Sequence, residues 1–288
     1  MNTSPSLRTQ GTKELRPRDF QMIRDFMYQK IGVDLEGKEV LIAARIGKAM
    51  RESGIASFEQ FFAQVQRERS GRTMTSMVDA LVTNHTSFFR EPQHFDFMRR
   101  VILPGLAPKV PIRIWSAACS SGEEPYSIAF TLMEELDHPD ISNAQILATD
   151  ISERVLTTAR RGLYPMSRFE AVPIERLRLH MLKGHGVSEG MYRIKSEVRA
   201  LIEFKQWNLM EDCSRLGKFS VIFCRNVMIY FDQATQQRVV NRLAAQLEPG
   251  GYLLIGHSES LNSIDHPLNY VCPATYRRPT SSMTRSSR

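Results

Sequence analysis

From residue 112 to residue 257, short apolar runs alternate with segments of helical pattern, and this alternation limits the possible folds most strongly. Strands are predicted at Ile112–Ala118, Ala144–Asp150, Phe219–Arg225 and Tyr252–His257. Helices are predicted to run from Glu123 or Glu124 to Leu136, from Ser152 as N-cap to Arg161, and from Gln233 to Leu247. Such alternation gives a doubly wound, mostly parallel, Rossmann-like sheet covered on both faces. The run Tyr270–Arg278 follows no helix and is expected as an antiparallel edge strand.

The alternation breaks between Tyr164 and Trp207. A helix is predicted over Pro173–Leu182, and short strands at Met191–Ile194 and Ile202–Gln206. We therefore expect residues 164–207 to form a small antiparallel β subdomain inserted in the sheet domain.

The chain before the sheet has a helical period. Apolar residues recur at helical spacing from Arg18 onward, so residues 18–90 are predicted to be an all-α helical domain. A proline-containing linker is expected at 91–110, and the sheet domain at 111–278. Residues 1–17 and the basic tail 279–288 are expected to be disordered.

Charge and composition exclude several classes of protein. The net charge is +7, with +4 in residues 1–90, +4 in residues 277–288 and −1 between them. No apolar stretch approaches the length of a membrane span, and the N-terminus lacks a secretory signal. The four cysteines lie far apart, without the spacing of a zinc site or a disulfide framework, so we expect a reduced, cytoplasmic protein with no metal site. We also expect no membrane insertion and a monomeric state.

Basic residues share one face of the helix predicted at Val40–Glu52. Arg45, Lys48 and Arg51 lie three residues apart, opposite Ile42 and Ile46. This face is either solvated or a dock for an acidic helix.

The loop Ala118–Pro125 follows the first strand, where a doubly wound sheet binds its ligand. It has one glycine and does not match the dinucleotide pattern, and Glu123 and Glu124 would repel a phosphate at the helix N-terminus. Asp150 ends the second strand, 28 residues after Gly122, where an acid binds ribose hydroxyls. A cationic adenosine ligand without phosphate is S-adenosylmethionine. Alternatively, Asp150 caps the next helix and Glu124 only stabilises the helix dipole.

Three long segments resemble the signatures of the CheR family, the chemotaxis receptor glutamate methyltransferases. These segments are Thr83–Glu91 (TNHTSFFRE), Trp115–Ser127 (WSAACSSGEEPYS) and Ile222–Asp232 (IFCRNVMIYFD). The resemblance covers residues 18–276 and departs locally at Cys119, where the family often has Ala. It implies methylation of receptor glutamates, with the helical domain docking on chemoreceptor helices.

The resemblance also implies roles for individual residues. It implies catalysis by Arg90 and Tyr230. It implies cofactor binding by a larger set: Asn84, Thr86, Arg90, Glu124, Asp150, Asn208, Leu209, Arg225 and Asn226. From the residues alone, Asn208 could instead be a turn residue, Tyr230 a core aromatic, and Arg90 with Glu91 a surface ion pair. Some members of the family capture a receptor C-terminal peptide on the inserted subdomain; Gly186 and Gly190 fit that use or a plain turn.

Two other functions are compatible with such a fold, a nucleic-acid methyltransferase and a catalytically silent adaptor. A nucleic-acid methyltransferase would carry a proline after the fourth strand, whereas Asn226–Ile229 has none, so no nucleic-acid partner is expected. A catalytically silent adaptor would be expected to lose the acidic and arginine positions that this chain retains.

Overall fold

The computed structural model describes residues 16–67, 72–106, 111–137, 141–170 and 172–280, and the chain divides into two compact units. One unit comprises residues up to Lys30 together with 34–83, and the other comprises 31–33 together with 84–288. The sequence places the boundary at residue 90 instead. Phe88 explains the difference, because it is 2% exposed and packs against Phe130 and Tyr164 of the sheet unit. The expected disorder at 1–15 and 281–288 lies outside the described residues.

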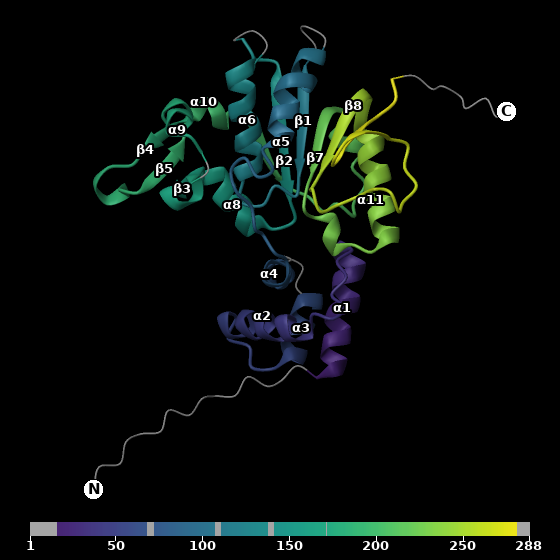
Figure 1. Ribbon diagram of the computed structural model, residues 1–288. Helices are drawn as coiled ribbons and strands as arrows, with labels where there is room; N and C mark the ends of the chain where they lie inside the picture. The colour runs from purple at the N-terminus through teal and green to yellow at the C-terminus, as the bar shows by residue number, and fades with distance from the viewer. Residues whose placement is uncertain (1–15, 68–71, 107–110, 138–140, 171, 281–288) are drawn as a thin grey trace, which may run out of the picture. The chain divides into compact units, whose positions relative to one another are not determined.

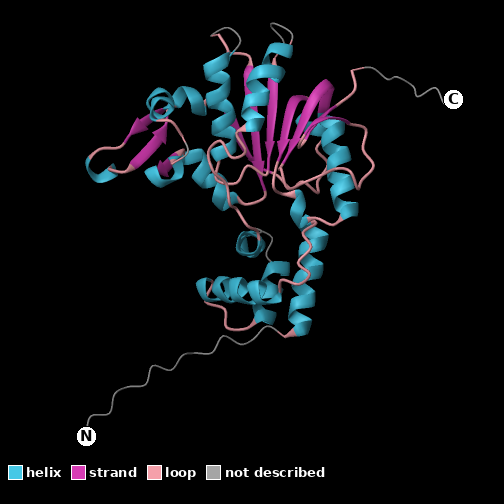
Figure 2. Cartoon of the chain, in the orientation of Figure 1, coloured by secondary structure: helices cyan, strands magenta, loops and turns pink. Residues whose placement is uncertain are grey.

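The first unit contains only helices and loops among its described residues (Figure 2). Its helices are α1 (Pro17–Ile31), α2 (Glu39–Glu52), α3 (Phe58–Arg67) and α4 (Arg72–Leu81). Residues four apart on one face, such as Ile23 with Met27 and Ile42 with Ile46, are at most 1% exposed. The predicted all-α domain is thereby confirmed, and burial of these faces holds it together.

The second unit is built on a seven-stranded sheet of order β6-β2-β1-β7-β8-β10-β9. The strands are β1 (Ile112–Ala117), β2 (Ala144–Asp150), β6 (Ile202–Gln206), β7 (Phe219–Cys224), β8 (Leu247–Ile255), β9 (Asn269–Cys272) and β10 (Thr275–Arg277). All pairings from β6 to β8 are parallel. Helices flank this sheet (Figure 1), as the alternation predicts.

Two strand predictions need correction. Ile202–Gln206 is not part of the insertion's sheet; it is the parallel edge strand β6 of the main sheet, paired with β2. An edge strand is partly exposed, and its alternating pattern therefore resembles that of an antiparallel strand. The predicted strand at 270–278 is a hairpin, in which β10 pairs with β8 and β9 forms the edge.

The segment predicted as a linker is helical in its described part. It forms α5 (Gln93–Phe97), a π-helix (Met98–Ile102) and a 3-10 turn (Leu103–Gly105). Phe95, Met98 and Ile102 are at most 1% exposed, so this segment belongs to the core. The prolines in this segment suggested a linker, but apolar residues at helical spacing, such as Phe95, Met98 and Ile102, make it a helix that packs in the core. The other long helices are α6 (Glu123–Glu135), α8 (Glu153–Arg161) and α11 (Gln233–Gln246).

The insertion forms a separate three-stranded antiparallel sheet of order β3-β5-β4. Its strands are β3 (Leu163–Pro165), β4 (Met181–Lys183) and β5 (Met191–Ile194), with the helices α9 (Ile174–His180) and α10 (Ser196–Arg199). Arg176 and His180 of α9 bind Glu134 of α6 at 2.6–3.0 Å, which attaches the insertion to the main domain.

Within the described part of the chain, no helix is both long and apolar enough to cross a bilayer.

Candidate active site

Polar side chains gather at the carboxyl ends of β1, β2 and β7. The strand order reverses between β1 and β7, since β2 lies on one side of β1 and β7 on the other. Ligands of doubly wound sheets bind at this reversal. The loop after β1 contains two non-glycine residues with positive φ, Ala118 (+64°) and Ser120 (+51°), so it follows a sharply turned path into α6.

Asp150 holds this loop. Its Oδ2 accepts the Ser120 backbone N–H at 2.8 Å, and its Oδ1 accepts that of Ser152 at 2.9 Å. The cap of α8 is supplied by Ser152, whose hydroxyl accepts the Val155 N–H, as the sequence predicts. Asp150 is therefore not the helix cap; it is a 6%-exposed carboxylate that joins the ends of β1 and β2.

Glu124 and Arg225 form an ion pair across the reversal point. Arg225 Nη1 lies 3.3 Å from Glu124 Oε2, and the Ser116 hydroxyl donates to Oε1 at 2.6 Å. Burial raises the pKa of Glu124, and the Arg225 charge opposes this rise. A carboxylate in such a place gains from a further cationic partner, for example an ammonium group.

The adjacent Glu123 is fully buried at the start of α6. It accepts a hydrogen bond from Ser121 Oγ at 2.7 Å and lies 3.3 Å from Arg168 of the insertion. Burial raises its pKa. An acidic side chain thus lies in the first turn of α6, where a phosphate would otherwise bind, which disfavours phosphate-bearing ligands.

The segment Asn84–Glu91 lies against these strand ends through its backbone. The Ser120 hydroxyl donates to the Asn84 carbonyl at 2.9 Å, and Arg225 donates to the Arg90 carbonyl. The Thr86 carbonyl accepts from Arg168 at 3.5 Å, and the Arg90 guanidinium donates to the His85 carbonyl at 3.0 Å. Of the expected site residues, Asn84 therefore lies beside the loop after β1 and Arg90 beside Arg225, whereas Thr86 contacts Arg168 of the insertion.

Glu91 pairs with Arg225, so the alternative of a surface ion pair between Arg90 and Glu91 is not what the structure shows. Its carboxylate accepts Arg225 Nη2 at 3.1 Å, Asn226 Nδ2 at 3.2 Å and the His257 backbone N–H at 3.2 Å. Burial disfavours its charged form, but Arg225 and the hydrogen bonds outweigh burial and keep the pKa of Glu91 below its usual value.

Glu259 organises the loop after β7. Its carboxylate accepts four backbone N–H groups at 2.6–3.3 Å, those of Gly256, Asn226, Met228 and Ile229. Asn226 has a positive φ of 57°, so this loop needs external support. Sequence reasoning missed Glu91 and Glu259; an acid just after a predicted strand, as in Gly256–Glu259, was the available signal.

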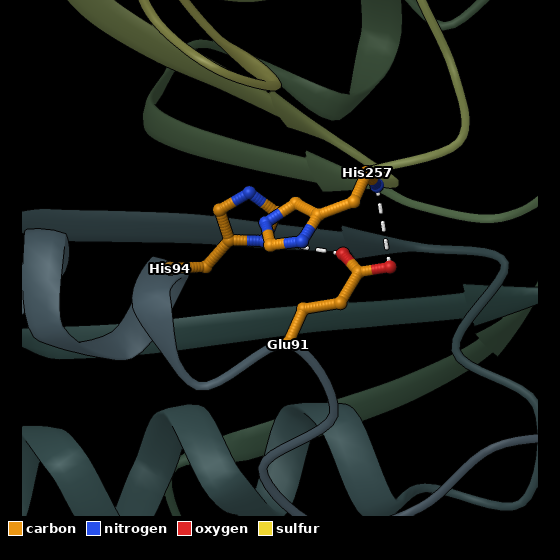
Figure 3. A group of neighbouring side chains, drawn as sticks. All are labelled: Glu91, His94 and His257. Atoms are coloured by element: carbon orange, nitrogen blue, oxygen red, sulfur yellow. Dashed lines mark hydrogen bonds and ion pairs between the residues drawn. The ribbon is translucent and has the colours of Figure 1, made fainter.

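Two histidines lie beside Glu91 (Figure 3). His94 Nδ1 is 3.5 Å from Glu91 Oε2, and the rings of His94 and His257 are 4.8 Å apart in an edge-to-face arrangement. Burial, with a contribution from Arg225, lowers the pKa of His94 to about 3, so its ring is neutral at pH 7. This group is the one place in the described residues where side chains could hold a metal ion.

The remaining expected site residues follow β6 and β7. The Trp207 backbone N–H donates to the Asp150 carbonyl at 2.9 Å, which brings Asn208 and Leu209 to the end of β2. Asn208 Oδ1 accepts the Met210 N–H at 3.0 Å, a turn contact. Tyr230 ends the 3-10 helix Met228–Tyr230 and is half-buried.

The basic face of α2 is smaller than the sequence suggests. Arg45 is half-buried and donates to the Leu81 carbonyl at 2.9 Å, so it caps the end of α4. Lys48 and Arg51 are exposed, and Lys48 lies 3.8 Å from Glu52.

Comparisons with known proteins cover both units. Residues 18–82 match the all-alpha domain of CheR methyltransferases, and residues 84–276 match their SAM binding domain. The chain is 42% identical over 260 residues to "Chemotaxis protein methyltransferase 2" of Pseudomonas aeruginosa, covering 90% of this chain and 92% of the relative. It is 39% identical over 261 residues to "Chemotaxis protein methyltransferase" of Borreliella burgdorferi, covering 88% and 91%.

Proposed function

Since the chain belongs to the CheR family of S-adenosylmethionine-dependent methyltransferases, we propose that it methylates glutamate side-chain carboxylates of chemoreceptor signalling domains. The products are glutamate methyl esters and S-adenosylhomocysteine, and the role is adaptation in bacterial chemotaxis. The observation that carries the proposal is the pair of carboxylates formed by Glu124, in the first turn of α6 after β1, and Asp150, at the end of β2. They suit a cationic, phosphate-free adenosine ligand.

The acidic residues fit the two polar ends of the cofactor. Glu124 is a mostly buried carboxylate that lies 3.3 Å from Arg225, and an ammonium group bound beside it would stabilise its charged form. Asp150 accepts one backbone N–H on each oxygen, and a carboxylate at the end of β2 is the acceptor that ribose hydroxyls would use.

Other residues would complete the cofactor site. Asn208 and Leu209 would contact the adenine, and Arg225 with Asn226 the methionine part. The segment Asn84–Arg90, with Thr86 at its centre, would cover the cofactor.

The proposed reaction is an in-line displacement. When bound, S-adenosylmethionine supplies an electrophilic methyl carbon on a sulfonium sulfur. A receptor glutamate has a pKa of about 4.3 and is ionised at pH 7, so no general base is required of the chain. Arg90 and Tyr230 would orient the incoming carboxylate and exclude water; positioning of this kind can supply roughly 7–11 kcal/mol.

The partner surfaces are proposed on both units. Lys48 and Arg51 of α2 would meet the acidic methylation helices of the receptor, with Arg45 holding the helix pair together. The edge strand β4, with Leu182 55% exposed, would capture a receptor C-terminal peptide by adding a strand. Tethering would raise the local concentration of receptor. We propose a cytoplasmic monomer.

The test is methyl transfer from labelled S-adenosylmethionine to a purified receptor signalling fragment. We expect label that base releases as methanol, since esters hydrolyse and N-methyl groups do not. Substitution of the receptor's methylated glutamates by alanine should abolish the label. Stable label, or label on the glutamate-free fragment, would contradict the proposal. Titration with receptor C-terminal pentapeptides and their scrambled versions tests the tether separately.

A further inference from the structure

Glu91, His94 and His257 converge from separate parts of the fold. Glu91 lies in the loop before α5, His94 in the first turn of that helix, and His257 after β8. Their ligand atoms all lie within 4.8 Å of one another (Figure 3). The methyl-transfer chemistry proposed above uses none of these three side chains directly.

The His94 ring has an unusual environment. It is 2% exposed, and among the described residues neither Nδ1 nor Nε2 has a hydrogen-bond partner, Glu91 Oε2 lying 3.5 Å from Nδ1. Buried polar atoms in native proteins are nearly always paired, and an unpaired one points to a bound water or ion. We propose that Glu91, His94 and His257 form a binding site for a divalent transition-metal ion of the zinc class.

The donor set favours zinc over the hard cations. Two imidazole nitrogens and one carboxylate are a ligand set that Zn²⁺ accepts with its fourth position open, whereas Mg²⁺ prefers oxygen ligands. Two ligand atoms of a tetrahedral zinc ion lie about 3.4 Å apart, given bonds near 2.1 Å. Ligand atoms that are up to 4.8 Å apart must therefore move closer by up to about 1.4 Å, and the exposed His257 side chain can make this movement.

The surroundings of Glu91 are compatible with a metal. Hydrogen bonds from Asn226 and Arg225 would orient the carboxylate, as outer partners of metal ligands do. The Arg225 charge is offset by Glu124 at 3.3 Å, so this group of charges does not repel a cation as an isolated arginine would. Because Glu91 also binds Arg225 and Asn226, a bound metal should alter cofactor affinity; this consequence alone rests on the proposed function.

The test is calorimetric titration of the full-length, tag-free, chelator-treated chain with Zn²⁺ and with Mg²⁺. His257→Ala removes an exposed ligand without opening the core. His185→Ala is the matched control, because His185 is also exposed but lies in the β4–β5 loop. Co²⁺ absorption provides a second readout that reports nitrogen and oxygen ligands without any activity measurement.

We expect one Zn²⁺ per chain, no comparable Mg²⁺ binding, and a loss of zinc affinity of at least about tenfold in His257→Ala. The His185→Ala control should bind as the wild type does. Absence of zinc binding, or equal binding by His257→Ala, would overturn the site. Cofactor titration of the metal-free chain is unaffected by that outcome, so failure of the metal site and failure of the proposed function are distinguishable.

Discussion

At the scale of single residues, Asp150 both connects the ends of β1 and β2 through hydrogen bonds and belongs to the proposed cofactor site. Asp150→Ala should weaken S-adenosylmethionine binding by about 1.5–3 kcal/mol, roughly 10- to 150-fold, because charge-assisted hydrogen bonds to the ribose are lost. Asp212→Ala is a matched control, since Asp212 also accepts a backbone N–H two residues ahead, from Ser214, but in an exposed loop. Calorimetry measures both. Unchanged affinity in Asp150→Ala would remove Asp150 from the site.

Glu259 makes a second prediction at this scale. Glu259→Gln places an NH2 group against backbone N–H donors, so we expect the loop that carries Asn226 and Tyr230 to loosen. The KM for S-adenosylmethionine should rise, and unfolding free energy should fall by about 1.5–3 kcal/mol. Glu248→Gln is the control. The Glu248 carboxylate accepts a hydrogen bond from the Ser220 hydroxyl and, among the described residues, none from a backbone N–H. Equal behaviour of the two variants would contradict the role given to Glu259.

His94 makes a prediction about pH. Its pKa of about 3 in the folded chain lies below the value of about 6.5 expected when unfolded. Between these two pH values the unfolded state binds the extra proton. The contribution of neutral His94 to the free energy of unfolding is therefore complete above pH 6.5 and is lost as the pH falls toward 3. The slope from this group is about 1.4 kcal/mol per pH unit. Urea unfolding between pH 6 and pH 4 should be less pH-dependent in His94→Phe than in the wild type or in His185→Phe; parallel curves would show that His94 is not responsible.

At the scale of elements, the exposed part of α2 can be tested without disturbing its packing. Lys48→Glu with Arg51→Glu leaves Arg45 on the Leu81 carbonyl, so the helical unit should remain folded. We expect receptor methylation to be lost and cofactor affinity to be kept. Arg100→Glu with Arg215→Glu, two exposed residues of the sheet unit, is the control of equal charge. Normal methylation by the α2 variant would show that this face is only a solvated surface and does not bind the receptor.

The same scale separates what the sequence could predict from what it could not. Buried strands such as Phe219–Cys224 are continuous apolar runs, so their place in a parallel sheet could be predicted. The edge strand β6 could not be assigned, because its partly exposed pattern does not identify its partner. In the site, family resemblance pointed to Glu124 and Arg225. The contacts of Glu259 are with backbone N–H groups, which leave no spacing pattern in a sequence.

At the scale of the whole molecule, charge is unevenly distributed along the chain. Residues 1–90 and 277–288 each carry +4, whereas the residues between them carry −1. The proposed cofactor residues from Glu124 to Asn226 lie in the balanced part, which uses short-range pairs such as Glu124 with Arg225. Recognition of an acidic receptor would instead depend on the basic excess, which acts at longer range.

Salt should therefore separate the two binding events. Exposed charges are screened beyond about 10 Å at 0.1 M ionic strength and beyond about 3 Å at 1 M. We expect kcat/KM for the receptor fragment to fall severalfold or more between low and high salt, while the dissociation constant for S-adenosylmethionine changes by less than about twofold, since buried pairs are screened much less. The Lys48→Glu, Arg51→Glu variant should lose most of the salt dependence. If receptor and cofactor respond equally to salt, the basic excess does not serve recognition, and docking must depend on apolar contacts that ionic strength does not weaken.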